Sequence, residues 1–63
     1  MKIILSNRDI PYEYVKACNK GHMHFTEDIH DAHNFTCVEE AEMLRAEVQD
    51  ATGNAWEVLI IED

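Results

Sequence analysis

The chain has 63 residues and a formal net charge of −8, from thirteen acidic and five basic side chains. A chain of this length forms one domain at most (1–63), and a domain so small buries only about 60% of the surface that its unfolded chain exposes. It contains no apolar run long enough for a signal peptide or a membrane span, and two cysteines are too few for a disulfide scaffold. These features exclude a membrane protein and favour a cytoplasmic location.

The charge is unevenly distributed along the chain. Residues 1–26 carry four basic and two acidic side chains, a net +2, whereas residues 27–63 carry one basic and eleven acidic side chains, a net −10. A field of that sign repels nucleic-acid phosphates and attracts basic protein surfaces. The sequence therefore predicts a protein partner with a basic surface and no direct contact with nucleic acid. The alternative is that the acidic residues only keep a small protein soluble.

Two strands are expected before residue 19. Residues 2–5, KIIL, are apolar on both faces. Residues 12–18, YEYVKAC, alternate and are rich in aromatic and branched side chains, which favours a strand. The alternative for this stretch is a helix with Asp9 as its N-cap and Gly21 as its C-cap.

A hairpin would follow in the strand interpretation. Residues 19–21, NKG, would form its loop, with Gly21 in the left-handed conformation. Residues 22–26 would then form the returning strand, with Met23 and Phe25 on the core face.

The clearest predicted element is an amphipathic helix that ends before Gly53, a suitable C-terminal stop. Thr36 and Glu39 have the spacing of a capping box at its start. Its core-facing side chains would fall on one apolar stripe at helical spacing: Cys37, Val38, Ala41, Leu44, Val48 and Ala51.

The opposite face of this helix is acidic. Its predicted partner-binding residues are Glu39, Glu42, Met43, Glu47 and Asp50. Met43 lies in the middle of the row, where a charged side chain would be expected. An apolar residue surrounded by charge on an outer face is typical of a protein-interaction surface.

The last stretch, WEVLIIED, is apolar on both faces from Val58 to Ile61, which predicts a central strand. The order β-β-β-α-β indicates an α+β domain with a small antiparallel sheet and one main amphipathic helix. The predicted core comprises Phe25, Leu44, Val48, Trp56 and Val58.

One helix covers only one face of a sheet. Ile3 or Ile4, together with Leu59 and Ile61, would then leave apolar side chains on the other face. Contiguous exposed apolar surface usually marks an interface, so a homodimer through the sheet is expected.

All four histidines lie within a short stretch, as an H-x-H pair, His22 and His24, and an H-x-x-H pair, His30 and His33. Four imidazoles could supply zinc ligands, but the usual helical H-x-x-x-H and C-x-x-C spacings are absent. Strand alternation also places the first pair away from the core. We therefore expect polar surface residues, with neither a metal nor a cofactor.

Catalysis is not expected. Cys37 lies on the predicted apolar stripe, which indicates a buried structural cysteine, and its acidic neighbours disfavour a thiolate. With two glycines in the chain, there is no phosphate-binding loop. The paired carboxylates lie on an open helix face, whereas acid–base catalysis requires a cleft that separates their ionisation.

The central stretch resembles short, uncharacterised acidic proteins encoded in bacteriophage and prophage genomes, with the pattern T-x-D-I-x-x-A-x-x-F, then E-E-A and a terminal strand. The matching positions are Thr26, Asp28, Ile29, Ala32, Phe35, Glu39, Glu40 and Ala41, followed by WEVLIIED. The resemblance implies a phage origin and no specific activity. In physical terms, Asp28 would cap a short turn and Phe35 would anchor the entrance to the helix.

Together these features predict a non-enzymatic interaction protein. Its most concrete form is a phage-encoded inhibitor of the anti-CRISPR or anti-restriction type, whose spaced carboxylates imitate DNA on a basic surface of a host protein. The alternative is a small metal-binding or structural accessory protein that uses His22, His24, His30 and His33.

Overall fold

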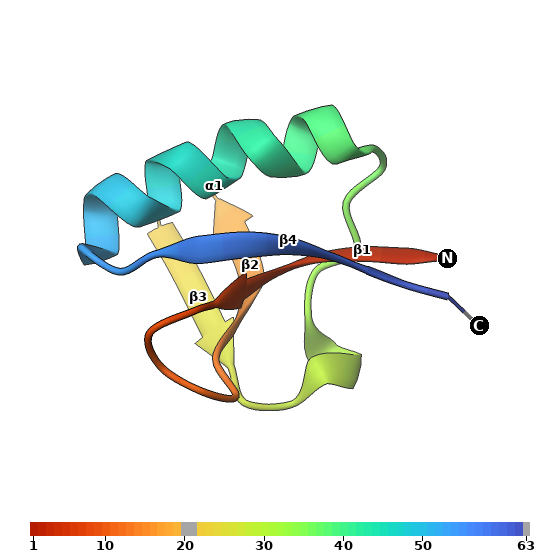
Figure 1. Ribbon diagram of the computed structural model, residues 1–63, viewed down its shortest axis with the longest axis horizontal. Helices are drawn as coiled ribbons and strands as arrows, with labels where there is room; N and C mark the ends of the chain where they lie inside the picture. Colours follow the sequence, from red (N-terminus) through yellow and green to blue (C-terminus); the bar gives the residue numbers. More distant parts are fainter. Residues whose placement is uncertain (20–21, 63) are drawn as a thin grey trace.

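The computed structural model describes residues 1–19 and 22–62. A four-stranded antiparallel sheet in the order β3-β2-β1-β4 packs against one α-helix (Figure 1). The elements are β1 (Lys2–Asn7), β2 (Tyr14–Asn19), β3 (His22–Thr26), the 3-10 turn η1 (Ile29–Asp31), α1 (Val38–Thr52) and β4 (Trp56–Ile61). No helix in these two ranges is long and apolar enough to cross a membrane.

The predicted α+β fold and the order β-β-β-α-β are confirmed. The ambiguous stretch 12–18 forms most of strand β2, so the helical alternative is wrong. β3 returns antiparallel to β2, with a register irregularity between Val15 and Ala17. The loop predicted for residues 19–21, with Gly21 in the left-handed conformation, lies partly outside the described residues.

Strand β4 lies at the edge of the sheet, so the prediction of a central strand is wrong. Its two apolar faces have another cause, because other elements lie on both sides of the sheet. Helix α1 lies on one side, and the yellow-green turn η1 lies on the other (Figure 1). On the η1 side, the Lys2 ammonium donates hydrogen bonds to the carbonyls of Ile29 and His30, at 3.2 and 3.1 Å.

This covering removes much of the apolar face expected to be bare. Ile4 is completely buried, and Leu59 and Ile61 are half-buried. Ile4 is therefore not available for the homodimer that was expected to form through this face of the sheet.

Strands β1 and β2 diverge, and the segment 32–35 fills the gap between them. β1 pairs with β2 only at Ser6, opposite Tyr14. Farther along β1, the Ile3 N–H donates to the side-chain oxygen of Asn34 at 3.0 Å, and the Ile3 carbonyl accepts from the Phe35 N–H at 2.8 Å. The chain thereby passes from η1 on one side of the sheet to α1 on the other (Figure 1).

The core lies between the sheet and α1. Its buried members are Ile3, Leu5, Val15, Phe35, Ala41, Val48 and Trp56, with Met23, Leu44 and Val58 packed against them. The predicted core is therefore correct for Val48 and Trp56, whereas Leu44 and Val58 are half-buried. Phe25 is 38% exposed, because it lies on the edge strand β3, although its ring stacks on that of Trp56 with centroids 5.5 Å apart.

The start of α1 differs from the prediction. The helix begins at Val38 with Cys37 as its N-cap, and no side chain caps it, so the capping box of Thr36 and Glu39 is wrong. Cys37 is exposed rather than buried, and Val38 and Ala51 are also exposed. Ala41 and Val48 are the buried residues of the helix, so its apolar stripe is narrower than the spacing indicated.

The end of α1 agrees with the prediction. Gly53 adopts the left-handed conformation with φ 76°, and its N–H donates to the carbonyl of Gln49 at 2.9 Å. Glycine adopts this conformation without the steric cost that a Cβ would impose.

Asn7 is the one polar residue among those buried in the described ranges. Its side-chain oxygen accepts from the N–H groups of Asp9 at 2.9 Å and Ile10 at 3.1 Å, which closes the turn after β1. Its amide also lies 3.4 Å from the side-chain oxygen of Asn54. The turn contains Tyr12 with a positive φ of 59°, a strained conformation for a residue with a Cβ.

We expect Leu5→Ala to lower the free energy of unfolding by about 2–5 kcal/mol, because it leaves a cavity beside β1. Leu44→Ala should cost less, because Leu44 is only half-buried and the site is open to solvent. Chemical denaturation of both variants measures the difference. An equal or greater loss for Leu44→Ala would contradict the assigned centre of the core.

We expect Asn7→Ala to cost about 1–3 kcal/mol, because it leaves two backbone N–H groups of the turn without their acceptor. Asn54→Ala is the matched control, since it removes only the 3.4 Å contact to the Asn7 amide. The same denaturation measurement applies. Equal losses in the two variants would show that the turn does not depend on the Asn7 oxygen.

Candidate functional site

The predicted partner-binding residues lie together on α1, and all of them are exposed: Glu39, Glu42, Met43, Glu47 and Asp50. At 100° per residue, Glu39, Met43 and Asp50 follow the line of the helix farthest from the buried Ala41 and Val48. Met43 is 75% exposed, so its side chain contributes little to the core. An apolar side chain presented in this way is available for contact with another molecule.

The five residues are not equivalent in charge. The Glu42 carboxylate accepts a hydrogen bond from Arg45 Nε at 2.8 Å, so its charge is compensated within the helix. Arg45 is also held by Gln49, whose side-chain oxygen accepts from its guanidinium at 2.8 Å. The attraction of α1 for a basic surface therefore rests more on Glu39, Glu47 and Asp50 than on Glu42.

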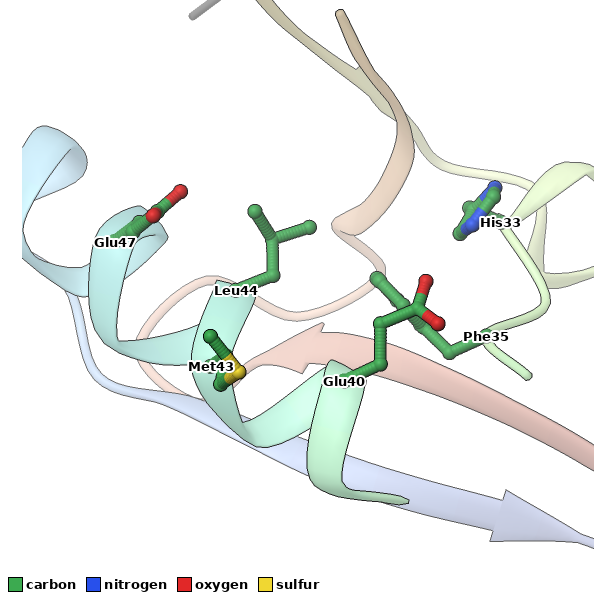
Figure 2. A pocket seen from close by; sticks show the side chains of 6 residues that line it. All are labelled: His33, Phe35, Glu40, Met43, Leu44 and Glu47. Carbon is green, nitrogen blue, oxygen red and sulfur yellow. The ribbon is translucent and has the colours of Figure 1, made fainter. Parts of the chain in front are cut away.

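An open pocket of about 290 Å³ lies beside this face, between α1 and the segment that fills the gap in the sheet. Its lining residues are His33, Phe35, Glu40, Met43, Leu44 and Glu47 (Figure 2). Phe35 is buried and Leu44 half-buried, so they form its apolar base. Glu40 and Glu47 are exposed, so their carboxylates form part of its rim.

This combination suits a long basic side chain. The aliphatic stem of a lysine or arginine can lie on apolar surface such as Leu44 while its charged end reaches a carboxylate. Hydrogen bonds between a charged donor and a carboxylate are stronger than those between neutral groups. Glu47 and Met43 belong to both the outer face and the pocket, so a basic partner surface could contact the two at once.

The predicted partner-binding residues did not include four of the lining residues, namely His33, Phe35, Glu40 and Leu44. For Glu40 a signal existed, because positions 40, 44 and 47 follow one another along a single flank of a helix. Phe35 was expected only as an anchor at the helix entrance. Its second role depends on how the segment 32–35 crosses the sheet, which no local pattern indicates.

The histidines are exposed at all four positions, His22 and His24 on β3, His30 in η1 and His33 after it. The ring of His33 packs edge-on against Phe35, with centroids 4.6 Å apart. Within the part of the chain that the structure describes, no three or more His, Cys, Asp or Glu side chains are grouped so that they could hold a metal ion.

The short turn before the pocket agrees with the physical role expected for Asp28. Its carboxylate accepts from the His30 N–H at 2.9 Å, which caps η1. Ala32 and Phe35 are buried after the turn, so they attach this segment to the core. The turn thereby positions His33 and Phe35 opposite α1.

Comparison with known proteins finds no match. No family model fits the chain, and no curated protein and no solved structure is significantly similar to it.

Proposed function

We propose that this protein is a non-enzymatic interaction module that binds a basic surface of a partner protein through the outer face of α1 and the adjoining pocket. The observation that carries the proposal is Met43, 75% exposed between carboxylates and beside an apolar pocket. A desolvated apolar side chain at the centre of an interface slows dissociation, and a charged rim speeds association.

The acidic surface also indicates what kind of partner it fits. A surface complementary to spaced carboxylates is also suited to nucleic-acid phosphates, so the partner would be a nucleic-acid-binding protein and this chain its inhibitor. The net charge of −10 over residues 27–63 and the resemblance to phage-encoded proteins support an anti-CRISPR or anti-restriction role. Competition between DNA and this chain for a purified partner tests that form.

Charge reversal on α1 should lower the association rate with the partner. We expect the double variant Glu39→Lys and Glu47→Lys to associate about 10-fold more slowly at low salt, since steering by a charged surface accelerates association 10-fold or more. Glu42 is left unchanged because its substitution would also break the pair with Arg45. The association and dissociation rates are measured with the partner immobilised on a sensor surface, at two ionic strengths.

The matched control is Glu27→Lys with Asp31→Lys, which changes the net charge by the same amount in and beside η1, on the other side of the sheet (Figure 1). It should slow association much less than the α1 variant. Equal slowing in both would mean that total charge, and not the face of α1, steers the encounter. An affinity that resists high salt and both double reversals would contradict the proposed interface.

Met43→Ala should mainly raise the dissociation rate, because the association rate depends on the surrounding carboxylates. A central interface side chain of this kind is worth about 1–2 kcal/mol, or roughly 5- to 30-fold in dissociation rate. Ile10→Ala is the control, an exposed apolar residue in the turn between β1 and β2. The same kinetic measurement compares them, and an unchanged dissociation rate for Met43→Ala would place the contact elsewhere.

A further inference from the structure

The outer edge of β4 carries backbone groups with no strand beside them. In the described residues β4 pairs with β1 alone. The carbonyl of Ala55 points to β1, because it accepts from the Arg8 N–H at 2.7 Å. The backbone groups of successive residues in a strand point to opposite sides, so the N–H and carbonyl groups of Glu57, Leu59 and Ile61 also point to β1. The N–H and carbonyl groups of Val58 and Ile60 therefore point outward.

The pairing of β1 gives the same result independently. Ile3 lies opposite Ile60. Its N–H and carbonyl are bonded to Asn34 and Phe35, on the side away from β4. Opposite residues that direct their backbone groups away from each other form a non-hydrogen-bonded pair. The N–H and carbonyl of Ile60 therefore again point away from β1.

The beginning of this edge is already closed. The Trp56 N–H donates to the side-chain oxygen of Gln49 at 3.1 Å. The open part is therefore the stretch Val58–Ile61, which contains no charged residue, no proline and no register irregularity. Ile60 is 50% exposed there. Natural edge strands are usually protected from pairing by charge, proline or a bulge.

We propose that a second copy of this chain pairs with the outer edge of β4, antiparallel and about a two-fold axis at Leu59. Val58 then lies opposite Ile60 of the partner subunit, and Ile60 opposite Val58 of the partner subunit. Each of these pairs exchanges both of its backbone hydrogen bonds. The two sheets become one, and both copies use the same edge, as a two-fold interface requires.

This register also avoids repulsion between like charges. Glu57 falls opposite Ile61 of the partner subunit, so no carboxylate of the strand lies directly opposite another. Like charges directly opposite each other destabilise a strand pair. The other edge strand, β3, is less suited, because it presents His22 and His24 and its pairing with β2 is irregular.

The net charge gives this association a distinctive salt dependence. Two chains of −8 repel each other, and added salt screens that repulsion. Self-association through β4 therefore strengthens with salt, whereas binding to a basic partner through α1 weakens with salt. The two surfaces can thus be tested separately, and a negative result for self-association through β4 does not contradict partner binding through α1.

Sedimentation of the full chain over a concentration range, at low and high salt, measures the association. We expect a shift from 7.3 kDa toward twice that mass, larger at high salt. Ile60→Lys should abolish the shift, because it places a charge beside the same charge of the second copy. His24→Lys, the same addition of charge on the opposite edge, should leave it intact. A 7.3 kDa species throughout, or equal loss in both variants, would overturn the proposal.

Cross-linking tests the register. In a background with Cys18→Ser and Cys37→Ser, Leu59→Cys places the two thiols opposite each other at the axis, and mild oxidation should join the chains. Ile61→Cys should not cross-link, because its two copies are four positions apart along the strands, about 13 Å, and a disulfide requires Cα atoms within about 7 Å. Circular dichroism checks that each variant is folded. Efficient cross-linking at 61 and none at 59 would overturn this register.

Discussion

The hydrogen bonds between β1 and the segment 32–35 are the constraint on which the rest of the structure depends. β1 is buried in the middle of the sheet, and buried backbone groups require partners. β2 pairs with β1 only around Ser6, where the Asn7 N–H donates to the carbonyl of Glu13, and nearer the start of β1 Asn34 and Phe35 bind the N–H and carbonyl of Ile3. The connection to the helix thereby becomes part of the sheet's own hydrogen bonding.

Several features follow from this crossing. The chain can reach both sides of the sheet, with η1 on one and α1 on the other (Figure 1). A chain of 63 residues therefore covers both faces of β1, and Ile4 is as well buried as Leu5. The crossing also places Phe35 under α1 and His33 at its flank, which creates one wall of the pocket (Figure 2).

The acidic face of α1 and the outer edge of β4 are separated by a row of polar residues on the helix, Glu42, Arg45 and Gln49. Gln49 accepts from Arg45 on the helix and from the backbone N–H of Trp56 at the start of β4. Arg45 in turn holds Glu42. This row connects the helix to the edge strand and compensates one acidic charge. The other carboxylates of α1 are exposed, and those of Glu40 and Glu47 line the pocket, so the acidic face and the strand edge can act independently.

Local patterns in the sequence determined the elements. Alternation predicted β2 and β3, helical spacing predicted α1 and its exposed acidic face, and Gly53 and Asp28 marked the helix end and the capped turn. Each of these depends on neighbours within a few residues, so the sequence alone carries the information. The helix start is the exception, because Cys37 occupies the N-cap without a side-chain bond.

Only the tertiary structure decided what covers each apolar residue. Hydropathy indicates that a side chain avoids water, but it does not identify the element that covers it. The apolar faces of β4 thus suggested a central strand, although β4 lies at an edge of a sheet that has α1 on one side and η1 on the other (Figure 1). Phe25 and Cys37 had apolar patterns and remain exposed because of where β3 and the start of α1 lie. The pocket likewise joins residues 33–35 to 40–47 through strand pairings that are remote in sequence.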